Sequence, residues 1–113
     1  MELRERSYGD VIVVDILGPI ESDAGDTVHL VASLKRLVGI GYKVVLLNVA
    51  ALNAVDSVIL GAIAQAHTSA IRSGATLKLV NVGDRLRELL AMTRLDRFIE
   101  TVISENDELE GHR

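Results

Sequence analysis

The chain has 113 residues, of which 49% are hydrophobic and 25% are charged, and it contains no cysteine. This length and composition are those of one globular domain, and a chain without cysteine has no disulfide framework and no thiolate metal site. Its formal charge at pH 7 is −4, and its aromatic residues are two tyrosines and one phenylalanine. A mildly acidic chain with so few aromatic rings lacks the basic patch and the stacking surface of a nucleic-acid-binding protein.

The N-terminal segment does not resemble an export signal, because residues 1–10 carry five charged side chains and no apolar run follows a basic start. The two longest charge-free stretches, 44–55 and 57–71, are shorter than a membrane span and contain polar residues. We therefore expect a soluble, cytoplasmic protein without direct membrane insertion.

Two short segments with the pattern of β-strands open the chain. Leu3–Tyr8 alternates weakly, whereas Val11–Leu17 is rich in β-branched residues and is terminated by Gly18-Pro19. The turn residues Gly9-Asp10 lie between the two segments. The pair is therefore predicted to form a hairpin.

Apolar residues then recur at spacings of three and four, which predicts a helix over Asp23–Val38. Ser22 or Asp23 is expected to cap its first turn, and Gly39 and Gly41 are expected to end it. The predicted inward face consists of Val28, Val31, Leu34 and Val38, widened by Leu30 and Leu37.

Strands and helices alternate in the rest of the chain. Lys43–Asn48 contains an unbroken apolar run, which is typical of a strand buried on both faces. After a connection of small residues, helical spacing resumes at Ser57 and ends at Ser73-Gly74. The later predicted elements are a strand, a short helix and a strand, over Thr76–Val80, Arg85–Met92 and Phe98–Val102. The polar segment Ser104–Arg113 is expected either to form a short surface helix or to fray.

This order of elements predicts an α/β layer architecture, with an N-terminal hairpin followed by strand–helix units. Helix-linked strands are expected to pair in parallel through right-handed crossovers, which gives a central mixed sheet of four to five strands. The chain has no internal repeat and no low-complexity linker. Residues 1–113 are therefore expected to form a single domain with a polar tail at about 104–113.

Motifs that would indicate catalysis or metal binding are missing from the chain. The sequence has no G-x-x-x-x-G-K-[ST] phosphate-binding loop and no G-x-S-x-G nucleophile elbow. None of the three histidines has a His, Asp or Glu residue three or four positions further on, and His67 is expected at the surface or boundary of its helix. We therefore expect no catalytic residue, no metal site and no cofactor. A solvated helix face is favoured over an anion site for Arg85, Arg87, Arg94 and Arg97.

The junction Asn53–Ser57 is the strongest candidate site. Its polar pair, Asp56 and Ser57, opens a helix, where the first backbone N–H groups are unpaired and the helix dipole is positive. One interpretation is a simple helix cap. The other is a phosphoacceptor serine, because a helix start tolerates a phosphate well although Asp56 would repel it. Gly61 lies one turn further on and leaves room for a partner, so a phosphate on Ser57 would act as a binary switch of that contact.

The sequence resembles the STAS domain family, and within it the single-domain bacterial anti-sigma factor antagonists, from about Val11 to Val102. Val55–Gly61 resembles the family's Asp-Ser-Ser-Gly-Leu-Gly stretch at the start of the second helix. Gly18–Glu21 resembles the Gly-x-Leu-Asp corner that follows the second strand. The resemblance implies a STAS-like layered fold in which the helices pack mainly on one face of the sheet.

The resemblance also implies a partner-switching mechanism that regulates transcription. In this mechanism the unphosphorylated antagonist binds an anti-sigma factor serine kinase, and the sigma factor is released. Phosphorylation of the serine that corresponds to Ser57 ends the binding, and a phosphoserine phosphatase resets the cycle. ATP and metal belong to these partners. The partner contact is expected to include Glu21, Ser22, Asp23, Asn53, Asp56 and Gly61.

Two other functions stay open on the sequence alone. Val58 and Ile59 stand where the family has a small residue and a glycine, which favours a phosphorylation-independent STAS interaction module in a signalling or transport assembly. Glu21 and Asn48 each stand where an aspartate is common in the family. An enzyme would need a base for the serine of the junction, such as His67 within hydrogen-bond reach.

Overall fold

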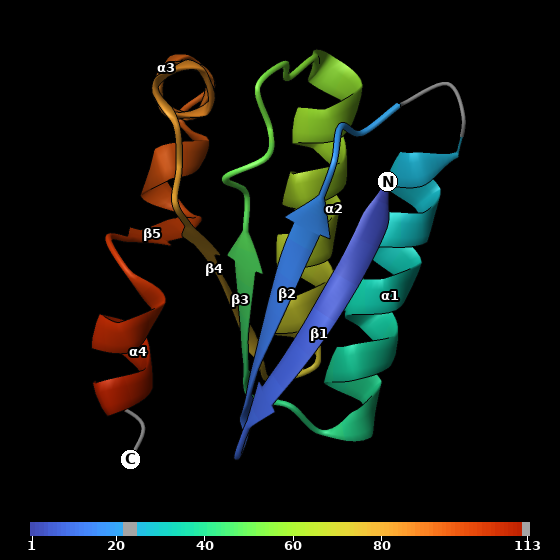
Figure 1. The fold of residues 1–113 in the computed structure, drawn as a ribbon, viewed down its shortest axis with the longest axis vertical. Coiled ribbons are helices and arrows are strands. Elements are labelled where there is room, and N and C mark those ends of the chain that lie inside the picture. The colour runs from blue at the N-terminus through green and yellow to red at the C-terminus, as the bar shows by residue number, and fades with distance from the viewer. Residues whose placement is uncertain (22–24, 112–113) are drawn as a thin grey trace.

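A five-stranded sheet forms the centre of the computed structural model, which describes residues 1–21 and 25–111 (Figure 1). The strands lie in sequence order across the sheet, with the first pair antiparallel and each later pair parallel. They are β1 (Glu2–Tyr8), β2 (Val11–Leu17), β3 (Val44–Asn48), β4 (Thr76–Val80) and β5 (Glu100–Val102). The structure confirms the predicted α/β fold with a mixed sheet and an N-terminal hairpin.

Four α-helices and a short 3₁₀ helix complete the described part of the chain. They are α1 (Asp26–Ile40), α2 (Ser57–Arg72), α3 (Asp84–Met92), η2 (Leu95–Arg97) and α4 (Glu105–Gly111). Helices α1 and α2 run side by side behind the sheet in Figure 1, and α3 contributes to the same core. Leu109 of α4 packs on the other face of the sheet. The helices therefore lie mainly on one face, as expected.

The main core lies between the sheet and the helices α1, α2 and α3. Alternate strand residues point into it because side chains alternate between the two faces of a strand. It includes Ile12, Val14, Val45, Leu47, Leu77 and Leu79 from the sheet and Leu30, Leu34, Leu37, Ile63, Leu86 and Leu90 from the helices. A second apolar cluster on the opposite face consists of Val11, Val13, Val44, Leu46 and Val80. Strand β3 is thus buried on both faces, which confirms the interpretation of its unbroken apolar run.

Helix α1 begins later than predicted. Its first residue is Asp26 rather than Asp23, and it follows Gly25 directly. The φ of Gly25 is +84°, a left-handed conformation that glycine adopts without steric strain. The predicted capping residues Ser22 and Asp23 lie outside the described residues.

The prediction of which residues of α1 face the core is wrong in part. Val28 is 72% exposed and Val38 is only partly buried. Leu30 and Leu37, the predicted margins of the face, are almost fully buried. Both sets of residues have helical spacing, so the pattern alone does not distinguish them. Packing against the sheet determines which of the two sets is buried, and it is the set that contains Leu34.

The remaining boundary differences lie at the ends of elements. Helix α1 runs through Gly39 and ends at Ile40, and Gly41 is its C-cap residue, with a φ of +124°. Strand β5 begins at Glu100 rather than at Phe98, because η2 and its hydrogen bonds keep the preceding segment turned. Residues 105–111 form the helix α4, which was one of the two alternatives for the polar tail.

A buried carboxylate organises the second face of the sheet. Asp15 on β2 is 1% exposed. Arg4 Nε (2.9 Å) and Arg6 Nε (2.8 Å) donate to its Oδ2, while Arg6 Nη2 (3.0 Å) and Asn48 Nδ2 (2.8 Å) donate to its Oδ1. Because β1 and β3 flank β2, this one carboxylate joins three adjacent strands. The bond from Arg6, with those from Asn48 and Arg4, outweighs the effect of burial and lowers the pKa of Asp15 to about 2.

The same arginine holds helix α4 against the sheet. Arg6 makes a two-point ion pair with Glu105 through Nη1 (2.9 Å) and Nη2 (2.7 Å), and this pairing lowers the pKa of Glu105. Further along α4, Glu108 accepts a hydrogen bond from Lys78 Nζ of β4 at 2.6 Å. Leu109 adds an apolar contact with the sheet. A helix of only seven residues is not stable by itself, so these tertiary contacts are what keep α4 from fraying.

Replacement of Asp15 by asparagine is expected to lower the free energy of unfolding at pH 7 by about 3 kcal/mol, because the hydrogen bonds from Arg4 and Arg6 to this buried side chain lose their charged acceptor. The pKa of this carboxyl is about 2 in the folded protein against 3.8 without the contacts, so its stabilisation is present above pH 3.8 and is lost as the pH falls towards 2. Urea unfolding followed by circular dichroism should show an acid loss of about 2 kcal/mol that Asp15→Asn lacks.

Asp96→Asn is the matched control, because it removes an exposed carboxylate on η2. It should leave both the unfolding free energy and its pH profile unchanged. An acid loss of equal size in the wild type and in Asp15→Asn would contradict the role given to this carboxylate.

Candidate functional site

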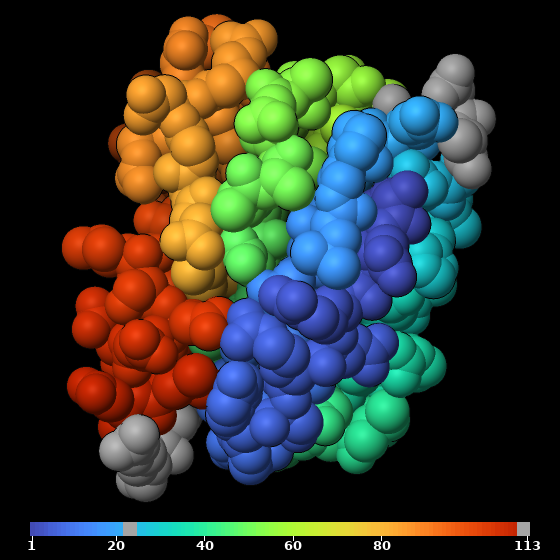
Figure 2. Space-filling model, in the orientation of Figure 1, coloured from blue at the N-terminus to red at the C-terminus, as the bar shows by residue number. Residues whose placement is uncertain are grey.

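The junction singled out in the sequence lies at the surface, in the loop of residues 49–56 between β3 and α2. Val49, Leu52 and Val55 are buried and anchor this loop to the main core. The Val49 amide donates to a carbonyl of β4 at 3.0 Å, and the side-chain oxygen of Asn48 accepts from a loop amide at 3.1 Å. Figure 2 shows the loop, in green, at the surface of the upper end of the molecule. The start of α2 is therefore presented in a defined position.

Asp56 is the N-cap residue of α2. Its backbone is extended (φ −107°, ψ 179°), and its Oδ1 accepts a hydrogen bond from the Ile59 amide at 2.8 Å. Its carbonyl accepts from the Leu60 amide at 3.0 Å. The capping interpretation is thus confirmed for Asp56, whose side chain satisfies one of the unpaired amides at the helix start.

Ser57 is the first residue of α2 and is exposed to solvent. Of its two branched neighbours, Val58 is 52% exposed and Ile59 is 2% exposed and packs into the core. Neither side chain encloses Ser57. The serine therefore lies where the active site of another protein can reach it.

The charges at the start of α2 oppose one another. This helix has 16 residues, and the amides of its first turn give the end a partial positive charge. The carboxylate of Asp56 adds a negative charge beside Ser57. A phosphate on Ser57 would be favoured by the helix end and disfavoured by the carboxylate, so it would change the charge of the surface more than it would change the fold.

The expected partner contact involves two loops at the same edge of the sheet. Strands β2 and β3 are parallel neighbours, so the segments that follow their carboxyl ends lie at one edge. Glu21, which follows β2, is exposed, and its amide donates to Asp26 Oδ2 of α1 at 2.8 Å. Asn53, in the loop before α2, is also exposed. Ser22 and Asp23, which are expected in the same contact, lie outside the described residues.

A shallow groove between α1 and α2 begins next to Ser57, and the sequence did not predict it. The groove has a volume of about 400 Å³, and its walls include Val28 of α1 and both Val58 and Gly61 of α2. A Cβ atom at Gly61 would meet nothing within 4 Å, so the glycine faces open space. The prediction missed this groove because it placed Val28 in the core.

His67 is buried, which corrects its prediction as a surface or boundary residue. It is 9% exposed, and its Nδ1 has no hydrogen-bond partner among the residues that the structure describes. Burial lowers the pKa of His67, so the ring is neutral at pH 7. His67 follows Ser57 by ten residues, or about 15 Å along the helix axis. The ring therefore supplies no base for the serine.

Within residues 1–21 and 25–111, no group of three or more His, Cys, Asp or Glu side chains is arranged to hold a metal ion. Arg85, Arg87, Arg94 and Arg97 are exposed, and Arg85 pairs with Glu88 at 3.8 Å, as in a solvated helix face. Across the same described ranges, no helix combines the length and apolar content needed to cross a bilayer.

Comparison with known proteins identifies the fold. The model of the STAS domain matches residues 3–108. A search of curated proteins gives no match. Among solved structures, an anti-sigma factor antagonist from Mycobacterium paratuberculosis is 18% identical with a TM-score of 0.79, and the match covers 97% of this chain and 92% of the other.

Two further solved structures have the same fold. The Bacillus cell fate determinant SpoIIAA in its phosphorylated form is 13% identical with a TM-score of 0.76, over 99% of this chain and 100% of the other. An anti-sigma-factor antagonist (STAS) domain protein from Planctomyces limnophilus is 11% identical with a TM-score of 0.80, over 98% of this chain and 97% of the other. At these low identities, the similarity to the solved structures shows a shared fold. The family model matches nearly the whole sequence. This chain belongs to the STAS domain family.

Proposed function

We propose that the protein is an anti-sigma factor antagonist in a partner-switching pathway that regulates transcription. It binds an anti-sigma factor serine kinase through the surface at the start of α2, and phosphorylation of Ser57 ends this binding. The observation that carries the proposal is the exposure of Ser57 at the first position of α2, next to a capped and anchored loop. A phosphoserine phosphatase restores the binding-competent form.

The solved structures support this role by analogy. Those from Mycobacterium paratuberculosis and Planctomyces limnophilus are described as anti-sigma factor antagonists, and the SpoIIAA structure is of a phosphorylated form. A shared fold does not by itself carry a function. The residue-level support comes from Ser57, because a protein that is modified by a kinase needs an exposed hydroxyl and no catalytic base of its own.

A phosphate would weaken the contact through charge and desolvation. The serine must enter the kinase active site beside the phosphates of the bound nucleotide, and its neighbour in the chain is the acidic Asp56. A phosphoserine there adds about −1.5 to −2 charges among like charges and must lose part of its hydration. A cost of about 3 kcal/mol is enough to weaken binding by more than a hundredfold.

Incubation with anti-sigma kinases from the source organism and Mg-ATP is expected to add one phosphate, which peptide mass spectrometry locates at Ser57. Ser57→Ala should abolish this modification. Ser73→Ala changes an exposed serine at the other end of α2 and should leave it intact. Lack of phosphate at Ser57, with a kinase that phosphorylates another antagonist in parallel, would contradict the proposal.

Binding of the kinase, measured by calorimetry in the presence of ADP, tests the effect of charge at Ser57. Ser57→Ala is expected to bind as tightly as the wild type, because it preserves the small side chain at the helix start. Ser57→Asp should bind more than about a hundredfold more weakly, because it places a fixed charge at this position. Equal affinities of the two variants would show that the charge at this position is not the switch.

A phosphorylation-independent STAS interaction module in a signalling or transport assembly is the second candidate. The observation that favours it is the 52% exposure of Val58, directly beside Ser57 and on the wall of the groove between α1 and α2. An apolar contact of this kind does not need the serine hydroxyl. Affinity purification that returns a scaffold or a transporter, with binding that is unchanged in Ser57→Asp and lost in Val58→Asp, would support this function instead.

Substitutions of Asp56 distinguish the effect of its capping hydrogen bond on stability from the effect of its charge. Asp56→Ala is expected to lower the free energy of unfolding by about 1 kcal/mol, because the Ile59 amide loses its acceptor. Asp56→Asn keeps an acceptor oxygen and should lower the free energy of unfolding by only about 0.3 kcal/mol. Urea unfolding measures both values. Equal losses in the two variants would mean that the charge, and not the hydrogen bond, is what stabilises the helix start.

A further inference from the structure

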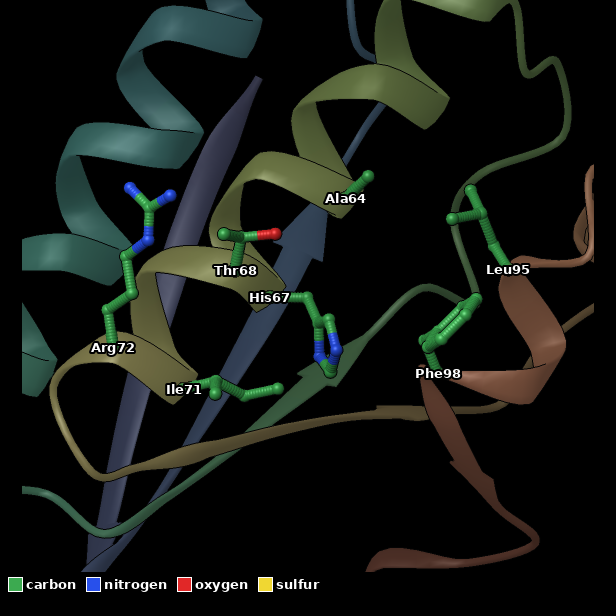
Figure 3. A pocket seen from close by; sticks show the side chains of 7 residues that line it. All are labelled: Ala64, His67, Thr68, Ile71, Arg72, Leu95 and Phe98. Atoms are coloured by element: carbon green, nitrogen blue, oxygen red, sulfur yellow. The ribbon is translucent and has the colours of Figure 1, made fainter.

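A second cavity lies beside the C-terminal half of α2, away from the candidate phosphorylation site. Its volume is about 370 Å³, near the lower limit for small-molecule sites. One wall is α2, and the other is the segment around η2 (Figure 3). The lining residues are Ala64, His67, Thr68, Ile71, Arg72, Leu95 and Phe98.

The two walls of this cavity expose large apolar side chains. Phe98, the single phenylalanine of the chain, is 69% exposed, and Ile71 is 56% exposed. Leu95 and Ala64 also line the cavity and are partly buried. The apolar surface on both walls would be removed from water by a molecule that filled the space, which favours binding of an apolar body.

His67 is the one polar group that is buried at this cavity. Figure 3 shows its ring extending from α2 into the space between the helix and Phe98. Its Nδ1 is buried and has no hydrogen-bond partner in the described part of the chain, so Nε2 is the nitrogen on the open side of the ring. A buried N–H without an acceptor is more costly than a bare ring nitrogen, so the proton of the neutral ring resides on Nε2. The ring therefore presents an N–H donor to the cavity.

Arg72 is the one charged residue among those that line the cavity. None of its lining residues is acidic. The guanidinium of Arg72 turns away from His67 in Figure 3 and also borders a separate groove near Lys35. The chemistry that fits is thus an apolar body and one acceptor of a hydrogen bond, without a net charge.

We propose that this cavity binds a small, uncharged, mainly apolar molecule through one hydrogen-bond acceptor, such as a carbonyl oxygen, which accepts from Nε2–H of His67. The apolar body of the ligand packs between Ile71 and Phe98. The site lies about 15 Å along α2 from Ser57, and it does not depend on the function proposed for that serine.

Acetophenone and ethylbenzene are suitable probes, because they have nearly the same shape and only acetophenone has a carbonyl oxygen. Titration of the isotope-labelled full chain is followed by NMR. Acetophenone is expected to cause saturable shifts in the signals of the Phe98 ring, the Ile71 methyl groups and the His67 ring. Ethylbenzene should shift the apolar signals with about fivefold lower affinity, since one hydrogen bond is missing.

Three variants test the assignment. His67→Phe keeps a ring in the cavity and removes the donor, so it should bring the affinity for acetophenone down to that for ethylbenzene. Phe98→Ser, at an exposed position, should weaken both probes. Met92→Ala removes an apolar side chain that is 70% exposed and lies outside the cavity, and it should weaken neither.

Failure of acetophenone to give saturable shifts in the wild type would overturn the proposal. Equal affinities of the two probes for the wild type would overturn the hydrogen bond with His67. Shifts at Ile71 and Phe98 that depend on protein concentration without any probe would also overturn it, because a second copy of the chain would then cover the cavity.

Discussion

The buried carboxylate of Asp15 is the interaction on which much of this structure depends. It accepts hydrogen bonds from Arg6 of the edge strand β1 and from Asn48 of β3. Arg6 also forms an ion pair with Glu105, which holds α4 against the sheet. The side-chain oxygen of Asn48 accepts a hydrogen bond from a backbone amide of the loop before α2. These hydrogen bonds outweigh the desolvation cost of burying the carboxylate, and they also fix the positions of the groups that they join. One hydrogen-bonded network joins three strands, the C-terminal helix and the loop that leads to Ser57.

The position of the candidate switch follows from this support. The buried residues Val49, Leu52 and Val55 anchor the loop before α2 to the core. Asp56 caps the helix that follows the loop. Ser57 is left exposed on a well-anchored element, and His67, the base considered for it, lies about 15 Å away along the helix. These properties support the proposal that Ser57 is modified by another enzyme. A serine nucleophile with its own catalytic function would instead need a base within hydrogen-bond reach, and His67 is too far along the helix to supply it.

The two ends of α2 differ in chemistry. Its first turn is polar and exposed and combines the Asp56 carboxylate with the positive end of the helix dipole. Its last turns border an apolar cavity in which the ring of His67 is the buried polar group. The middle of the helix is fixed between α1 and the sheet through residues such as Ile63, which is 0% exposed. The helix therefore carries the proposed protein-partner surface at its start and the proposed small-molecule site near its end.

Local patterns in the sequence were enough to predict the order of the elements, the mixed sheet and the polar pair Asp56 and Ser57. Strand alternation, helical spacing and capping involve residues that are close together in the chain. Tertiary structure alone decided which stripe of α1 faces the core, that His67 is buried, and that the polar tail docks as α4. Each of these depends on a contact between distant segments, as in the ion pair of Arg6 with Glu105, 99 residues away. The sequence carries no local signal for such a contact, because its energy exists only after the sheet has brought the two side chains together.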